Sequence, residues 1–83
     1  MRVRVRLFAT LREIVGREDV AWSLRAGATL GDLVADVVQE HPGLAPHRSS
    51  MLLAVNWEFT DSSRSLRDGD EVALMPPVSG GRR

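Results

Sequence analysis

The residues best placed for chemistry stand near the C-terminal end of the chain, in the segment ALMPPVSGGRR. Pro76 and Pro77 each fix φ and lack a backbone N–H, so strand pairing must stop there and the chain must leave the domain extended. Gly80 and Gly81 have no Cβ and allow another protein to approach the backbone closely. Most domain ends are frayed, but a frayed end needs neither a proline stalk nor paired glycines. Residue types alone are compatible with a frayed domain end and with a functional tail.

Other catalytic constellations are weaker. A metal shared by His41 and His47 would need a third ligand such as Glu40, and both histidines lie in turn-like sequence, so solvated histidines are favoured. Gly27 and Gly31 are too sparse for a phosphate-binding loop. The serines lack a G-x-S-x-G context and are typical of turns; they are Ser49, Ser50, Ser62, Ser63 and Ser65.

Composition narrows the classes of function. The 83 residues suffice for one domain, and eleven acidic residues balance eleven basic ones, so no net field attracts nucleic acid or anionic lipid. Trp22 and Trp57 are therefore interpreted as core or partner contacts, not as base-stacking platforms. The absence of cysteine excludes thiolate chemistry and fits a reducing cytoplasm, while the absence of lysine excludes Schiff-base catalysis. No segment approaches a membrane span.

The elements that would position the tail follow from hydrophobic periodicity. Alternation predicts strands, and the 3.6-residue period predicts helices. The predicted order is a strand over 2–8, a short helix over 9–15 ended by Gly16, a strand over 20–24, a helix over 30–41, a turn-rich loop over 43–50, a single strand over 51–59, a tight turn at Gly69 and a strand over 71–75.

The second helix carries the strongest signals at both ends. Thr29 can cap its first turn, with Asp32 as the acidic partner of a capping box, and Pro42 prevents continuation beyond His41. One long helix between an N-terminal hairpin and later strands is typical of an α+β fold of the β-grasp class, with a mixed sheet covered by one main helix. We expect a domain over residues 1–75 and an extended tail over 76–83.

Met75 is the candidate partner contact beside the tail. Successive residues of a strand point to opposite faces of the sheet, so Leu74 and Met75 must face different ways. We expect one of the pair to stay exposed as an apolar contact for another protein, the alternative being that both belong to the core.

Three segments together indicate a family. LFATLREIVG near the start, LLAVN in the predicted third strand and above all LRDGDEVALMPPVSGG resemble the small subunit of molybdopterin synthase, of the MoaD/ThiS family of ubiquitin-like sulfur carriers. The resemblance runs from Arg2 to Gly81 and extends to the thiazole-pathway sulfur carrier and to ubiquitin-like archaeal modifiers.

The resemblance implies a non-catalytic carrier subunit of a sulfurtransferase complex in molybdenum cofactor biosynthesis. In the family, an enzyme resembling the ubiquitin-activating enzyme uses ATP and Mg²⁺ to adenylate the terminal glycine, here Gly81, and sulfur from a persulfide then gives a thiocarboxylate. The chain itself would bind no cofactor. The large synthase subunit would hold the tail, and the thiocarboxylate would attack the pyranopterin precursor there. The tail-binding residues would be Pro76, Pro77, Val78, Ser79 and Gly80.

Arg12 occupies the arginine position of the family's F-A-x-x-R-E segment. A salt bridge to a partner protein and an ordinary solvated charge on a helix are both compatible with that position.

The end of the chain departs from the family pattern. Arg82 and Arg83 follow Gly81, so the Gly81 carbonyl is an amide and the terminal carboxylate belongs to Arg83. We expect a protease to remove the two arginines; a binding or protein-modifier role and a fused or altered pathway are the alternatives. A modifier would carry the same tail, so the sequence does not separate modification from sulfur transfer.

Overall fold

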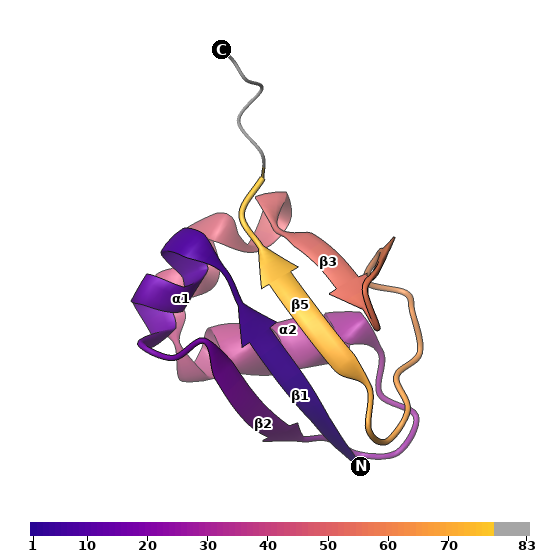
Figure 1. Ribbon diagram of the computed structural model, residues 1–83. Helices are drawn as coiled ribbons and strands as arrows, with labels where there is room; N and C mark the ends of the chain where they lie inside the picture. The colour runs from indigo at the N-terminus through magenta and orange to yellow at the C-terminus, as the bar shows by residue number, and fades with distance from the viewer. Residues whose placement is uncertain (78–83) are drawn as a thin grey trace.

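The computed structural model describes residues 1–77 of the chain (Figure 1). Its elements follow the sequence in the order β1 (Arg2–Leu7), α1 (Ala9–Val15), β2 (Asp19–Ser23), α2 (Leu30–Glu40), the 3₁₀ helix η1 (Pro42–Ser50), β3 (Leu52–Val55), β4 (Glu58–Thr60) and β5 (Glu71–Met75). The α+β fold predicted from the sequence is confirmed.

The strands form one mixed sheet in the order β2-β1-β5-β3-β4. The first and last strands, β1 and β5, are parallel neighbours at its centre, whereas β1 with β2, β3 with β4 and β3 with β5 are antiparallel. The predicted N-terminal hairpin is thus present. Helix α2 crosses one face of the sheet (Figure 1). Within residues 1–77 no helix covers the other face, which is called the outer face below.

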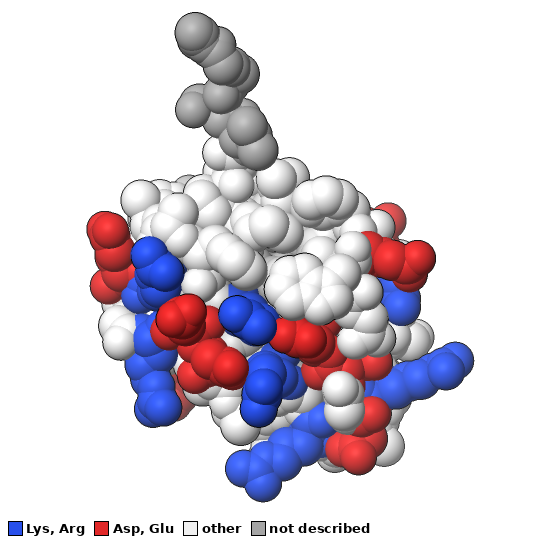
Figure 2. Space-filling model, in the orientation of Figure 1, with Lys and Arg blue, Asp and Glu red and all other residues white. Residues whose placement is uncertain are grey.

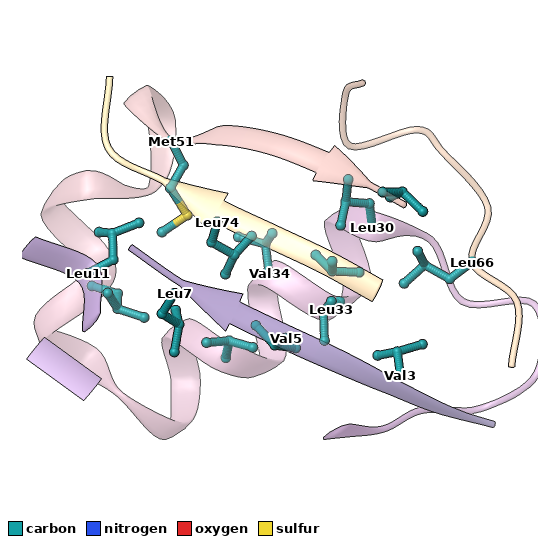
Figure 3. Close-up of a cluster of buried hydrophobic side chains, with 14 residues drawn as sticks. Val3, Val5, Leu7, Leu11, Leu30, Leu33, Val34, Met51, Leu66 and Leu74 are labelled. Atoms are coloured by element: carbon teal, nitrogen blue, oxygen red, sulfur yellow. The ribbon is translucent and has the colours of Figure 1, made fainter. Parts of the chain in front are cut away.

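The core lies between the sheet and α2 (Figure 3). Alternation along β1 turns Val3, Val5 and Leu7 inward, where each is at most 3% exposed. Leu33 and Val37 from α2 are also buried. The remaining buried members of the cluster are Leu11, Leu30, Val34, Leu44, Met51, Val55, Leu66, Val72 and Leu74. This packing fixes β5 against the helix and so fixes the place where the tail begins.

Both predicted ends of α2 are confirmed. The Thr29 hydroxyl accepts from the N–H of Asp32 at 3.2 Å, and the Asp32 carboxylate accepts from the N–H of Thr29 at 3.0 Å. That backbone hydrogen bond holds the pKa of the Asp32 carboxyl below its ordinary value. The helix ends at Glu40, just before His41 and Pro42. The capping box therefore sets the position of the helix over the sheet.

Two segments differ from the prediction. Residues 42–50 form the 3₁₀ helix η1, where a turn-rich loop was predicted. The segment has little apolar periodicity, yet its Leu44 is fully buried. Residues 51–59 are not one strand but a hairpin, because Asn56 and Trp57 have φ values of 50° and 69°. Two consecutive positive φ values make the two-residue turn that reverses an antiparallel pair.

Helix α1 begins with an unusual backbone conformation. Gly16 ends it in the left-handed region, as predicted, with φ of 84°. At the other end, however, Ala9 has φ of 52°, and its side chain is exposed. The left-handed region costs a residue with a Cβ about 1–2 kcal/mol. The junction between β1 and α1, directly beside the end of β5, is therefore strained.

We expect Ala9→Gly to raise the free energy of unfolding by about 0.5–1 kcal/mol, because relief of the positive φ exceeds the added entropy of the unfolded chain. Denaturant unfolding of both proteins gives the difference. Glu13→Gly is the matched control, since Glu13 lies exposed within α1 and glycine there should cost about 0.5 kcal/mol. Loss of stability in both variants to the same extent would show that Ala9 is not strained.

Candidate functional site

The tail leaves the domain from the end of the central strand β5. Met75 is the last residue of β5 and lies opposite Leu52 of β3. Pro76 is half-buried and Pro77 is exposed, and neither can donate a backbone hydrogen bond to continue the sheet. The predicted tail residues Val78, Ser79, Gly80 and Gly81, together with Arg82 and Arg83, lie outside the described residues. The exit point of the tail is thus fixed by the core.

The two faces of β5 differ as the alternation predicts. Leu74 is fully buried against α2, whereas Met75 faces outward and is half-buried. Met75 is therefore the member of the pair that another protein can reach. Its role as a partner contact stays a prediction.

The surface around the tail exit is uncharged. Figure 2 shows a broad region without charged side chains at the base of the tail, and acidic and basic side chains gathered toward the opposite end of the molecule. Leu52 and Met75, both half-buried, belong to this end of the outer face. A protein that contacted this end of the domain would meet uncharged side chains before it met charged ones.

Arg12, the second predicted partner contact, projects from α1. Its side chain is exposed, and within residues 1–77 it makes no salt bridge. Its backbone carbonyl accepts from the N–H of Gly16 at 2.8 Å and so helps to end the helix. The structure is compatible with both roles considered for Arg12.

A cluster on the outer face, beside the row of Met75 and Leu52, was not predicted as a unit. Trp57 and Phe59, on the β3–β4 hairpin, are 62% and 72% exposed. The Arg6 guanidinium lies 5.6 Å from the centre of the Trp57 ring and pairs with Glu71 at 3.3 Å. The sequence signals were the outward position of Arg6 in β1 and the two aromatic residues, but a single long strand over 51–59 hid the turn that brings them together.

The other candidate chemistries gain no support from geometry. His41 packs beside Trp22 with ring centres 6.5 Å apart. Within residues 1–77 no cluster of three or more His, Asp or Glu side chains could hold a metal ion. In the same part of the chain no helix is both long and apolar enough to span a membrane. The tail and the outer face remain the features to explain.

A five-stranded β-grasp sheet with one covering helix and a C-terminal tail leaving its central strand defines the class of small ubiquitin-like proteins. Within that class the chain belongs to the ThiS family, whose model matches residues 5–81.

Individual relatives agree with this assignment. The molybdopterin synthase sulfur carrier subunit of Chlamydomonas reinhardtii is 37% identical over 98% of this chain and 100% of that protein. The crystal structure of SAMP1, a small archaeal modifier protein, from Haloferax volcanii is 31% identical with a TM-score of 0.86, over 98% and 100% of the two chains. A chain in the complex of subunits 1 and 2 of the molybdopterin-converting factor of Helicobacter pylori is 30% identical with a TM-score of 0.71, over 98% and 100%.

Proposed function

We propose that this chain is the sulfur carrier of molybdopterin synthase and that Gly81, after removal of Arg82 and Arg83, carries the sulfur. The observation that carries the proposal is the tail exit: β5 pairs with β1 up to Leu74 and with β3 up to Met75, and the Pro-Pro-Val-Ser-Gly-Gly segment of a sulfur carrier follows at once. The ThiS family membership and the relatives that are named sulfur carrier subunits support it.

The chemistry requires activation of a carboxylate. A terminal carboxyl group has a pKa of about 3.3–3.7 and is ionised at neutral pH, which makes it a poor electrophile. An E1-like adenylating enzyme would join the Gly81 carboxylate to AMP, with release of pyrophosphate and with Mg²⁺ balancing the phosphate charge. A donor persulfide would displace AMP, and a thiol would then cleave the S–S bond and leave a thiocarboxylate. The nucleophilic sulfur then resides on the chain terminus, so the carrier needs no cysteine.

The tail is long enough for delivery. Gly81 is six residues beyond Met75, a distance of about 20 Å when the chain is extended. The body of the carrier would dock outside the large subunit while Pro76 to Gly81 entered its channel, and the two glycines would pass a narrow part of that channel. In the Helicobacter pylori factor, subunit 1 is in complex with subunit 2.

The second candidate is a protein modifier, which the structural likeness to SAMP1 favours. The tail would then form isopeptide bonds with lysines of target proteins. Sulfur transfer in another pathway, such as thiazole synthesis, would use the same thiocarboxylate on a different acceptor. These roles differ in what is attached to Gly81.

The mass of the protein isolated from its own cells tests the proposal. A sulfur carrier is expected to end at Gly81 and to show one oxygen replaced by sulfur. A carrier found only as isopeptide conjugates would instead establish the modifier role. A chain that retained Arg82 and Arg83 in all its forms would contradict processing.

In the form that ends at Gly81, Gly81→Ala should lower adenylation and sulfur transfer strongly, because a methyl group crowds the reacting carbon. The melting temperature should change little, since a terminal residue beyond the prolines adds nothing to the core. Activity assays and thermal unfolding of the same preparations give both values. A large fall in melting temperature would show that the tail is packed against the domain.

A further inference from the structure

Every basic side chain in the sequence is a guanidinium. All eleven basic residues are arginine. An arginine side chain stays protonated throughout the physiological pH range, so it has no free electron pair with which to attack a carbonyl carbon. A lysine amine loses its proton more readily and serves as a nucleophile in many enzymes. The positive charge of the chain is therefore carried by groups that do not become acylated.

The α-amino group of Met1 is the remaining amine of these 83 residues, and the fold keeps it away from the tail. It donates to the carbonyl oxygen of Leu24 at 2.7 Å in a partly buried position. Because β1 and β5 are parallel and Leu7 lies opposite Leu74, Met1 and Met75 are at opposite ends of the sheet (Figure 1). Seven residues of extended strand separate their levels, about 23 Å. To attack another group, the Met1 nitrogen would have to give up its hydrogen bond.

Activation would make the end of the chain a target for amines. In the acyl adenylate of the proposed function, the carbonyl carbon of Gly81 is an electrophile. An amine that attacked it would form an amide bond, AMP would leave with the electron pair of the broken C–O bond, and the nitrogen would release a proton. The product would be a cross-linked carrier that could no longer accept sulfur.

Histidine and serine do not take the place of lysine in this reaction. An acyl imidazole is itself an activated acyl group, and its hydrolysis returns the Gly81 carboxylate. A serine hydroxyl needs a neighbouring base to become a nucleophile. The hydroxyl of Ser50 lies near His47, but it donates to the backbone carbonyl of that residue at 3.2 Å and not to the ring.

Arg48 shows how close to the tail an amine could lie. It is exposed on η1, and within residues 1–77 it forms no salt bridge. It precedes Leu52, the partner of Met75 in the sheet, by four residues, which span at most about 14 Å. The extended tail reaches about 20 Å from Met75 to Gly81. An amine at position 48 would therefore meet activated Gly81 of the same chain at an effective concentration of about 1 mM.

We propose that the chain is a one-way acyl donor: activated Gly81 passes to other molecules, but not to its own chain or to a second copy. Activated carriers then wait for the persulfide without cross-linking. In a protein-modifier role, each acceptor lysine takes a single unit, and no chain of units grows on it. The inference rests on the proposed function, because it requires activation of Gly81, and it gives the arginine-only composition a chemical role.

The test uses the form that ends at Gly81, incubated with the cognate activating enzyme, ATP and Mg²⁺ without a sulfur donor and then analysed by intact mass. The parent should form no covalent adduct with itself. Arg48→Lys should form adducts within one chain or between two, each lighter than its components by one water, at a yield at least about tenfold above the parent. Peptide mapping should place the new bond between Gly81 and position 48. Arg48→Gln removes the same cation without adding an amine, so it is the matched control and should behave like the parent.

A parallel reaction with hydroxylamine separates the inference from the proposed function, because hydroxylamine converts activated Gly81 to a hydroxamate in every variant. If the parent gives no hydroxamate, activation fails and both the inference and the proposed function are wrong. If the hydroxamate forms but the parent also cross-links with itself, the inference is overturned and the proposed function stands. The same conclusion follows if Arg48→Lys, folded by thermal unfolding, gives no more adduct than Arg48→Gln.

Discussion

A chain that ends at Gly81 is expected to support ATP–pyrophosphate exchange by the cognate activating enzyme, whereas the chain that ends at Arg83 is expected to give only background exchange. The reason is chemical: only the shorter chain presents a glycine carboxylate as nucleophile toward the α-phosphate of ATP. In the longer chain the Gly81 carbonyl belongs to a peptide bond, and the terminal carboxylate lies two residues farther on, at Arg83. We expect a difference of at least about a hundredfold, as for loss of a reacting group.

A chain that ends at Arg82 is the matched control, because it is shortened but still lacks a free glycine carboxylate. It should behave like the full-length chain. Equal exchange with all three chains would contradict the need for processing and would mean that the activating enzyme accepts an arginine carboxylate. Restoration of exchange by treating the full-length chain with a carboxypeptidase specific for basic residues would support trimming directly.

Met75→Asp should weaken the complex with the large subunit by about 3 kcal/mol, or roughly a hundredfold in Kd, because it buries an unpaired charge in an apolar contact. Met75 faces outward beside the tail exit, so the substitution leaves the core residue Leu74 in place. Calorimetric titration of the chain ending at Gly81 measures the change, and thermal unfolding establishes that the variant is folded.

Arg64→Asp is the control for that experiment. Arg64 lies in the loop before β5, where its carbonyl accepts from the N–H of Leu30 at the start of α2. It is therefore beside the helix that covers the other face of the sheet, and the substitution should change the Kd by less than about twofold. If Arg64→Asp weakened binding and Met75→Asp did not, the interface would not lie beside Met75, although the chemistry of Gly81 would be unaffected.

The parts of the fold that were predictable have local causes. Thr29, Asp32 and Pro42 specify both ends of α2 through hydrogen bonds and sterics within a few residues. Gly16 and Gly69 mark positive φ because glycine alone takes that conformation without cost. The alternation of arginine with apolar residues in β1 predicted the inward face of that strand correctly, because only one of its faces is buried.

The parts that were missed depend on long-range packing. Leu44 is buried by elements distant in the sequence, so η1 has no periodicity of its own to reveal it. The β3–β4 turn contains Trp57 where glycine is the usual signal, and the apolar run around it reads as one strand. The strand order could not be predicted because it depends on the parallel pairing of β1 with β5, the first and last strands in the sequence.

The same difference between local and long-range causes applies to the candidate site. The tail could be proposed from the sequence because its residues are contiguous, and its role stays a prediction. The outward position of Met75 was predictable because its alternation with Leu74 is local. The contact between Arg6 and Trp57 was not, since it joins residues on opposite sides of β5 and exists only with this strand order. Sites within one segment can be derived from patterns, whereas sites across a sheet require the topology.

The parallel pairing of β1 and β5 has a mechanical consequence. The chain enters β1 at one end of the sheet and leaves β5 at the opposite end (Figure 1). A force that pulls the C-terminal end of β5 away from the N-terminal end of β1 therefore acts along the strands. The hydrogen bonds between residues 4–7 of β1 and residues 71–74 of β5 then bear the load together, in shear, instead of breaking one after another. We therefore expect the domain to resist force that is applied along its C-terminal strand.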